Sequence, residues 1–129
     1  MCRLFIGADP ELWESVTRSF RMDGMVTSVR LEHMFWNVLE DIAARQDLNV
    51  RQLLHQLYNE SIDEGHDLGN FTSFLRVCCL RFIDLQLNGL IATESAHDFD
   101  ALPAEEILLK EREQRAASKN RRAVNSTQH

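Results

Sequence analysis

The chain has 129 residues, of which 44% are hydrophobic, and it carries a formal net charge of −6 at pH 7. This hydrophobic content excludes a wholly disordered chain, and the length corresponds to one domain with a tail. The negative total argues against nucleic-acid binding through bulk charge, but phosphate contacts depend on local positive patches. A nucleic-acid-binding surface therefore has to be sought locally along the chain.

The amino-terminal arm ends in a segment with the pattern of a hairpin. Residues 2–6 read Cys-Arg-Leu-Phe-Ile, which favours a short strand or a hydrophobic anchor that stops at residues 7–10. Residues 15–22 alternate in character, and Asp23-Gly24 stands between two such runs, which indicates a tight turn. The arm is therefore expected either to add a strand beside the next one or to reach along a partner.

The stretch from Met25 to Leu31 is the candidate functional strand. It is rich in β-branched residues and alternates in character, and successive side chains of a strand point to opposite faces. One face is predicted to carry Thr27, Val29 and Leu31, and the other Val26, Ser28 and Arg30. A strand needs a partner for its backbone groups, and the simplest partner is the same strand of a second copy.

Two helices are predicted directly after this strand, each with one apolar stripe. The stripes comprise Phe35, Val38, Leu39, Ile42 and Ala43 in the first helix and Val50, Leu53, Leu54 and Leu57 in the second. Asp47-Leu48-Asn49 breaks the pattern between them, and Asn49 is a suitable cap for the second helix. We expect Phe35 in the core and Trp36 either at a dimer interface or partly exposed and packed against a third helix.

That third helix is predicted from Asn70 or Thr72 to about Leu87. It is apolar nearly all round, so we expect it to be buried and to complete the core of a dimer. After Asn88 the composition changes.

The carboxy-terminal part is predicted to hold one short helix, Ala104 to Gln114, opened by Pro103 and followed by a disordered tail. Residues 110–122 contain six basic side chains against two acidic ones. Such a segment favours either nonspecific DNA affinity or a merely solvating tail.

The sequence offers no catalytic constellation, cofactor-binding loop or metal-binding pattern. His33, His55, His66 and His97 are scattered, and the three cysteines lack ligand spacing. We expect Cys2, Cys78 and Cys79 to be small buried hydrophobes in a reducing cytoplasm. Residues 4–6 form too short an apolar run for a signal peptide, and no run is long enough for a membrane span. The predicted protein is a cytoplasmic non-enzyme without cofactor or metal.

Two blocks of the sequence carry a resemblance to a known family. Residues 27–36 read T-S-V-R-L-E-H-M-F-W, and residues 70–77 read N-F-T-S-F-L-R-V. They resemble the ribbon-helix-helix (Arc/methionine-repressor-like) DNA-binding superfamily, most closely a bacterial branch with a T-S-x-x-L-E-x-x-F-W signature. The resemblance covers roughly residues 18–83.

This resemblance implies a homodimer whose paired strands enter the major groove of DNA. Val26, Ser28 and Arg30 then occupy the three outward positions that contact bases. Arg30 suits the O6 and N7 atoms of guanine, Ser28 suits either base type, and Val26 suits only a thymine methyl group. Many relatives carry a basic or amide residue at the position of Val26, and this departure weakens the expected sequence discrimination.

The resemblance also implies contacts to the DNA backbone. The start of the second helix, at Asn49, Val50 and Arg51, presents free N–H groups and a partial positive charge that suit a phosphate oxygen. Arg18 and Arg21 of the arm are further candidate phosphate contacts, although a solvated edge explains them equally well.

We therefore predict a mainly α-helical fold with a short β-ribbon: a ribbon-helix-helix dimer with an intermolecular antiparallel strand pair. Residues 1–23 form the added arm, residues 24–87 the core with its third helix, and residues 88–129 a partly disordered extension. The predicted function is that of a bacterial transcriptional regulator, a repressor that binds double-stranded DNA as a homodimer or as a higher oligomer on DNA. No membrane contact is expected.

Two alternatives belong to other classes of protein. One is an antitoxin-like interaction scaffold in which residues 90–129 wrap a protein partner. The other is a small-molecule-responsive regulator whose ligand binds the basic face of the ribbon and competes with DNA.

Overall fold

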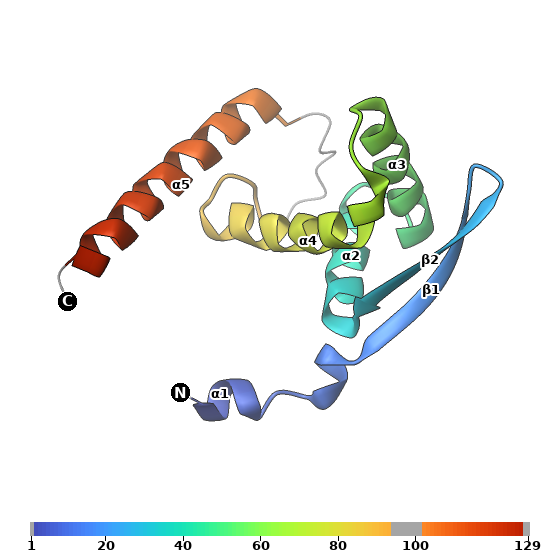
Figure 1. Cartoon of the computed structure of the whole chain (residues 1–129), viewed down its shortest axis with the longest axis horizontal. Helices are drawn as coiled ribbons and strands as arrows, with labels where there is room; N and C mark the ends of the chain where they lie inside the picture. Colours follow the sequence, from blue (N-terminus) through green and yellow to red (C-terminus); the bar gives the residue numbers. More distant parts are fainter. Residues whose placement is uncertain (1, 94–101, 128–129) are drawn as a thin grey trace. The chain divides into compact units, whose positions relative to one another are not determined.

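The computed structural model describes residues 2–93 and 102–127, which divide into two compact units, residues 1–82 and residues 83–129 (Figure 1). In chain order the elements are α1 (Cys2–Ile6), the 3-10 helix η1 (Pro10–Trp13), β1 (Ser15–Met22), β2 (Met25–Glu32), α2 (His33–Arg45), α3 (Val50–Asp63), the 3-10 helix η2 (Leu68–Asn70), α4 (Phe71–Leu87) and α5 (Ala104–Thr127). The predicted class, mainly helical with a short β-ribbon, is confirmed. No helix among these described residues is long and apolar enough to cross a membrane.

The ribbon is an antiparallel hairpin of β1 and β2, in register from the pair Ser15–Glu32 to the pair Met22–Met25. Asp23 and Gly24 form the two-residue turn with φ angles of 52° and 80°. Positive φ at both central residues is typical of the type I′ turn, whose twist matches that of the flanking strands.

The hairpin shows what the amino-terminal arm does. The arm adds a strand beside β2, which was one of the two alternatives predicted for it. The physical reason is that a two-residue turn brings β1 beside β2 at almost no loop-closure cost. The predicted pairing of β2 with the same strand of a second copy stays a prediction, because it would use the other edge of β2.

Trp36 lies in the core beneath the ribbon. Its side chain is fully buried, its ring centroid is 5.9 Å from that of Phe20, and its indole Nε1–H donates to the backbone oxygen of Val16 at 2.9 Å. Phe35 is only half-buried, so the prediction that Trp36 is the more exposed of these two neighbours was wrong. Trp36 is buried because β1 supplies both an aromatic neighbour and a hydrogen-bond acceptor for its indole.

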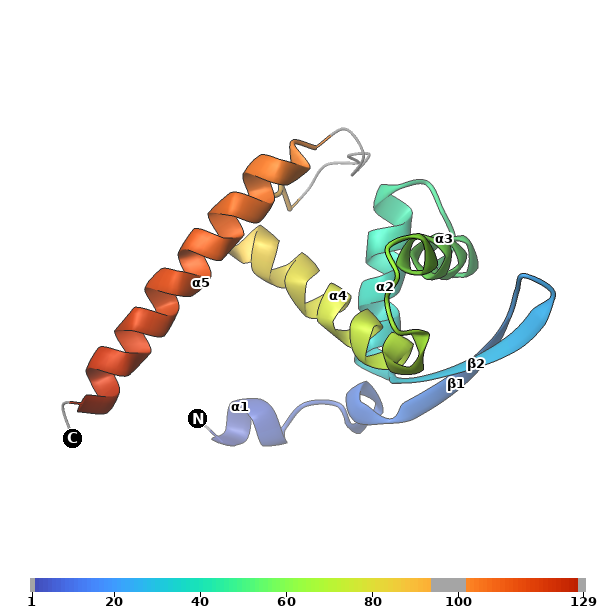
Figure 2. The same ribbon diagram turned by 45° about the horizontal axis from the view of Figure 1, so that its top comes forward.

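The helices cover one side of the ribbon, as Figure 2 shows for α2, α3 and the first turns of α4. The core between them is built from the apolar side chains of both strands and three helices. Its most deeply buried members are Val29, Leu31, Trp36, Leu39, Leu53, Leu54, Leu75 and Cys79. The predicted inward orientation of Val29 and Leu31 is confirmed.

Helix α4 buries one face rather than its whole circumference. Phe71, Leu75, Cys79 and Phe82 are buried, whereas Val77 and Leu80 are 52% and 58% exposed. The hairpin, α2 and α3 offer neighbours for only one side of α4 in the single chain. The burial of α4 in the core of a dimer therefore stays a prediction.

Two terminal elements also differ from expectation. Cys2–Ile6 forms the short helix α1, not a strand, and α5 continues to Thr127, well past the predicted end at Gln114. Residues 104–127 contain no glycine or proline and are rich in Ala, Glu, Arg and Lys, which favour helix wherever nothing interrupts them. His97 lies outside the described residues.

The burial of Trp36 predicts a difference between the two tryptophans of the chain. Trp36→Phe removes a buried hydrogen bond and part of the packing beneath β1, so we expect it to lower the free energy of unfolding by about 1–3 kcal/mol. Trp13, whose side chain is 57% exposed, is the control. Trp13→Phe should change the free energy of unfolding by less than about 0.5 kcal/mol. Urea unfolding followed by circular dichroism measures both, and equal losses would contradict the placement of Trp36.

Candidate nucleic-acid interface

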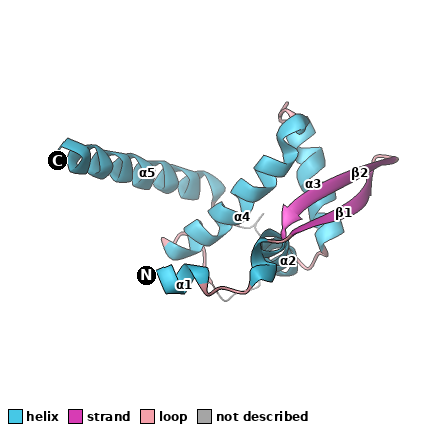
Figure 3. Ribbon diagram, turned by 60° about the horizontal axis from the view of Figure 1, so that its bottom comes forward, coloured by secondary structure: helices cyan, strands magenta, loops and turns pink. Residues whose placement is uncertain are grey.

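One side of the ribbon faces away from the helices (Figure 3). On β2 the exposed residues of this side are Val26, Ser28 and Arg30, as the alternation predicted. The register places a residue of β1 directly across from each of them. The pairs are Arg21 with Val26, Ser19 with Ser28 and Thr17 with Arg30.

This outward face is locally positive although the chain as a whole is acidic. Arg21 and Arg30 are exposed at opposite ends of it, and the hydroxyl oxygens of Ser19 and Ser28 lie 3.3 Å apart at its centre. The carboxylate that shares this face, Glu32, stands at the end of the strand and is paired with an arginine. Positive potential and hydroxyl groups are the features that attract phosphate and base edges.

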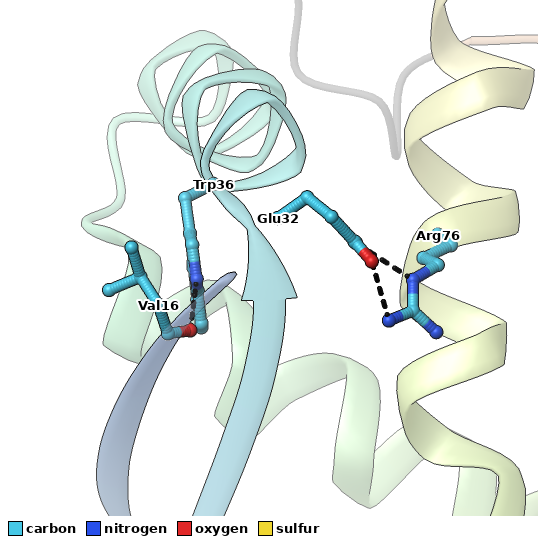
Figure 4. Close-up of polar contacts among 4 residues, drawn as sticks. All are labelled: Val16, Glu32, Trp36 and Arg76. Atoms are coloured by element: carbon cyan, nitrogen blue, oxygen red, sulfur yellow. Dashed lines mark hydrogen bonds and ion pairs between the residues drawn. The ribbon is translucent and has the colours of Figure 1, made fainter. Parts of the chain in front are cut away.

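Glu32 and Arg76 form a two-pronged ion pair between the end of β2 and α4 (Figure 4). The Arg76 Nε–H and Nη2–H donate to the two carboxylate oxygens of Glu32 at 3.1 and 3.0 Å. These hydrogen bonds, together with one from the Glu32 backbone, hold the pKa of the Glu32 carboxyl below its usual value of 4.5. Glu32 belongs to the sequence block of residues 27–36 and Arg76 to the block of residues 70–77, so the pair joins these two blocks in space.

Arg18 lies on the inward side of the ribbon, apart from the outward face. Its guanidinium donates to the Glu40 carboxylate at 3.3 Å and lies 4.6 Å from the ring centroid of Trp36. Both contacts direct its charge toward α2. Arg21 stands on the outward face, so the two arginines of the arm that were predicted as phosphate contacts are on opposite sides of the sheet.

The start of α3 is a capped helix terminus with an arginine beside it. Asn49 Oδ1 accepts from the Gln52 N–H at 2.8 Å, and the Asn49 N–H donates to Gln52 Oε1 at 2.9 Å, so the predicted cap is present as a capping box. The N–H groups of Val50 and Arg51 in the first turn have no acceptor within a helix. The side chain of Arg51 is exposed.

Helix α3 approaches the tip of the hairpin through one polar contact. The His55 Nε2 atom lies 3.8 Å from the Asp23 Oδ1 atom in the turn. His55 follows the start of α3 by little more than one helical turn. The first half of α3 therefore lies near the tip of the ribbon.

The cysteines offer no activated nucleophile among the described residues. Burial raises the pKa of Cys78 to about 11 and that of Cys79 to about 12. Cys79 is buried and its thiol donates to the Phe35 backbone oxygen at 3.6 Å, whereas Cys2 is exposed, contrary to prediction. Within the described part of the chain, no three His, Cys, Asp or Glu side chains gather as metal ligands would.

Thr17 and Ser19 of β1 are the members of the outward face that the sequence prediction missed. The signal was present, because a two-residue turn at Asp23-Gly24 fixes the pairing of every residue on both strands. Counting outward from that turn places Ser19 across from Ser28 and Thr17 across from Arg30.

Comparison with known proteins agrees with this geometry. A family model described as a ribbon-helix-helix domain matches residues 15–83, a region that begins at the first residue of β1. Among solved structures the chain is similar to an uncharacterized protein from Bordetella pertussis Tohama I. The two share 45% sequence identity with a TM-score of 0.79, over 84% of this chain and 86% of that one. No curated protein matches the chain.

The Glu32–Arg76 pair predicts a pH dependence of stability. Because the pKa of Glu32 is lower in the folded chain, the pair stabilises the fold fully above pH 4.5 and loses its effect as the pH falls through the folded value. We expect Glu32→Gln to lower the free energy of unfolding by up to about 1 kcal/mol at pH 7, since both side chains are partly exposed. Urea unfolding between about pH 3 and pH 7 should show the wild-type and variant values converging at the acid end. Parallel curves would contradict the assignment.

Proposed function

The chain belongs to the ribbon-helix-helix domain family, and on this premise we propose that it is a homodimeric, sequence-specific DNA-binding protein. In this proposal it regulates transcription in a bacterium, as a repressor that occupies promoter DNA. The observation that carries the proposal is the outward face of the ribbon, where Ser28 and Arg30 are exposed beside Arg21. A two-stranded ribbon fits the width of the major groove.

The three outward residues of β2 divide the recognition of bases among them. The Arg30 guanidinium donates two hydrogen bonds to the O6 and N7 atoms of a guanine. Ser28 donates to or accepts from either base type. Val26, which is 65% exposed, makes an apolar contact with a thymine methyl group.

The start of α3 holds the DNA backbone beside the ribbon. Val50 and Arg51 present N–H groups that have no acceptor within the helix, and the helix dipole and the Arg51 guanidinium add positive charge for one phosphate. Asn49 contributes as the cap of this terminus, since its own N–H donates to Gln52. The 3.8 Å approach of His55 to Asp23 supports this role, because it shows that the first half of α3 lies near the tip of the ribbon.

Dimerisation in this proposal uses the second edge of β2. A two-residue turn makes Met22–Met25 a hydrogen-bonded pair, and hydrogen-bonded and non-hydrogen-bonded pairs then alternate along the ladder. The hydrogen bond from His33 N–H to the Glu14 oxygen, at 2.8 Å, fits this alternation. Val26, Ser28 and Arg30 consequently direct their backbone N–H and C=O groups away from β1.

No other strand among the described residues pairs with that edge of β2. Unpaired backbone N–H and C=O groups at a sheet edge favour pairing with a further strand. The same strand of a second copy, related by a two-fold axis, would pair with these groups of β2. The result is a four-stranded sheet in the order β1, β2, β2 of the partner, β1 of the partner. Val77 and Leu80, exposed on α4, are apolar surface for such a dimer to cover.

An interaction scaffold is the second candidate function. Helix α5 runs for 24 residues with almost all of its side chains exposed, and its basic residues outnumber its acidic ones from Lys110 onward. Such a helix suits an acidic groove on a partner protein. Capture of a partner by α5 would be compatible with DNA binding by the ribbon.

The central prediction concerns Arg30. Arg30→Ala should weaken binding to the chain's own promoter DNA at least about tenfold, because each bidentate contact to guanine contributes about 1–3 kcal/mol of discrimination. Binding to random duplex should change little, so the preference of the protein for promoter DNA over random DNA disappears. Fluorescence anisotropy over a salt series measures both affinities, with Arg3→Ala in α1 as the control. Failure of the wild-type protein to bind either duplex at about 100 mM salt would overturn the proposed function.

A second prediction tests the free edge of β2. Ser28→Pro removes an N–H that points away from β1, so the hairpin should survive while association of two copies weakens at least about tenfold. Ser19→Pro is the matched control, because Ser19 pairs with Ser28 and directs its N–H to the outer edge of β1. Sedimentation velocity across a concentration series separates the two variants. Equal association of both would contradict pairing through β2.

A further inference from the structure

The outward face of β1 has a composition unlike that of an ordinary solvated edge strand. Its outward residues are Ser15, Thr17, Ser19 and Arg21, which comprise three hydroxyl groups and one guanidinium. Exposed edge strands are usually protected by charged side chains, a bulge or a proline. Strand β1 lacks proline, and the charge on this face is the positive one of Arg21 with no carboxylate beside it, so the face carries nothing that repels an anion.

The same residues also present their backbone N–H groups at the outer edge. Thr17, Ser19 and Arg21 belong to the non-hydrogen-bonded pairs of the ladder, so their N–H groups point away from β2. Each position therefore combines an edge N–H with a hydroxyl or a guanidinium on the outward face. Hydroxyl groups, backbone N–H groups and arginines are the donors that proteins use for phosphate oxygens.

The width of a paired sheet decides what these donors meet. Neighbouring strands lie about 4.8 Å apart, so in a dimer joined through β2 the two β2 strands lie about 2.4 Å from the two-fold axis and the two β1 strands about 7 Å from it. The major groove is about 12 Å wide, which places its walls about 6 Å from the same axis. The β2 strands then face the base edges, whereas the β1 strands stand over the two sugar–phosphate backbones.

We propose that β1 is a phosphate-contacting strand. In the dimer, Thr17, Ser19 and Arg21 of each copy contact the DNA backbone on one side of the major groove, while β2 contacts the bases within it. The inference rests on the proposed function and adds to it a division of labour between the strands. Strand β2 supplies sequence discrimination, and β1 fixes the depth and alignment of the ribbon without reading bases. Arg18 has no part in this contact, because it lies on the inward side with Glu40.

Two variants of β1 test the proposal. Arg21→Gln removes the charge, so we expect weaker binding to promoter and random duplex by the same factor. The slope of log affinity against log salt should shrink by about 0.9 for each phosphate that is no longer neutralised, or about 1.8 for the dimer. Thr17→Val with Ser19→Ala removes the hydroxyls and introduces no charge into the strand. This double variant should weaken binding to promoter and random duplex by the same factor. The slope of log affinity against log salt should stay unchanged, because the number of charges is the same.

The controls separate failure of this inference from failure of the proposed function. Arg30→Ala should change the ratio of promoter to random affinity, which neither β1 variant should change. Circular dichroism and sedimentation confirm that each variant remains a folded dimer. Suppose that the wild type binds DNA and that Arg30→Ala behaves as expected. The role of β1 alone is then overturned if both β1 variants bind DNA as the wild type does, or if either variant has an altered base preference. If the wild type binds no DNA, both proposals fall.

Discussion

Backbone hydrogen bonds between β1 and β2 hold the outward residues of β2 in place, and the packing beneath follows from their register. A turn of only two residues at Asp23-Gly24 leaves no freedom in that register. Once it is set, Phe20 and the Val16 carbonyl stand over α2, where Trp36 fills the space and donates to that carbonyl. The hairpin is thus at once the outer wall of the core and the exposed surface.

The arginines of the ribbon are distributed between these two roles. Arg18 contacts Glu40 and Trp36 on the inward side, whereas Arg21 and Arg30 are exposed on the outward side. Arg76 of α4 neutralises Glu32, the acidic residue at the end of the same face. A chain with a net charge of −6 therefore presents two exposed arginines on the outward face of its ribbon, where the carboxylate of Glu32 is paired.

The alternation of a strand allows the ribbon to serve two purposes without conflict. Outward side chains of β2 are directed perpendicular to the sheet, while the backbone groups of the same residues are directed along its plane. In the proposed dimer the side chains meet DNA and the backbone edge meets the second copy. Each residue then contributes to both contacts through different atoms, and the strand β1 completes the sheet on its outer side.

The sequence by itself determined the helical stripes, the Asn49 cap, the Asp23-Gly24 turn and the side on which Val26, Ser28 and Arg30 lie. These features depend on local chemistry and periodicity, which are readable over a few residues. Only the tertiary structure decided that β1 occupies one edge of β2, that Trp36 is buried in place of Phe35, and that Arg76 meets Glu32. Each of these depends on which of several possible neighbours an element meets in space, and periodicity along one segment carries no information about that choice.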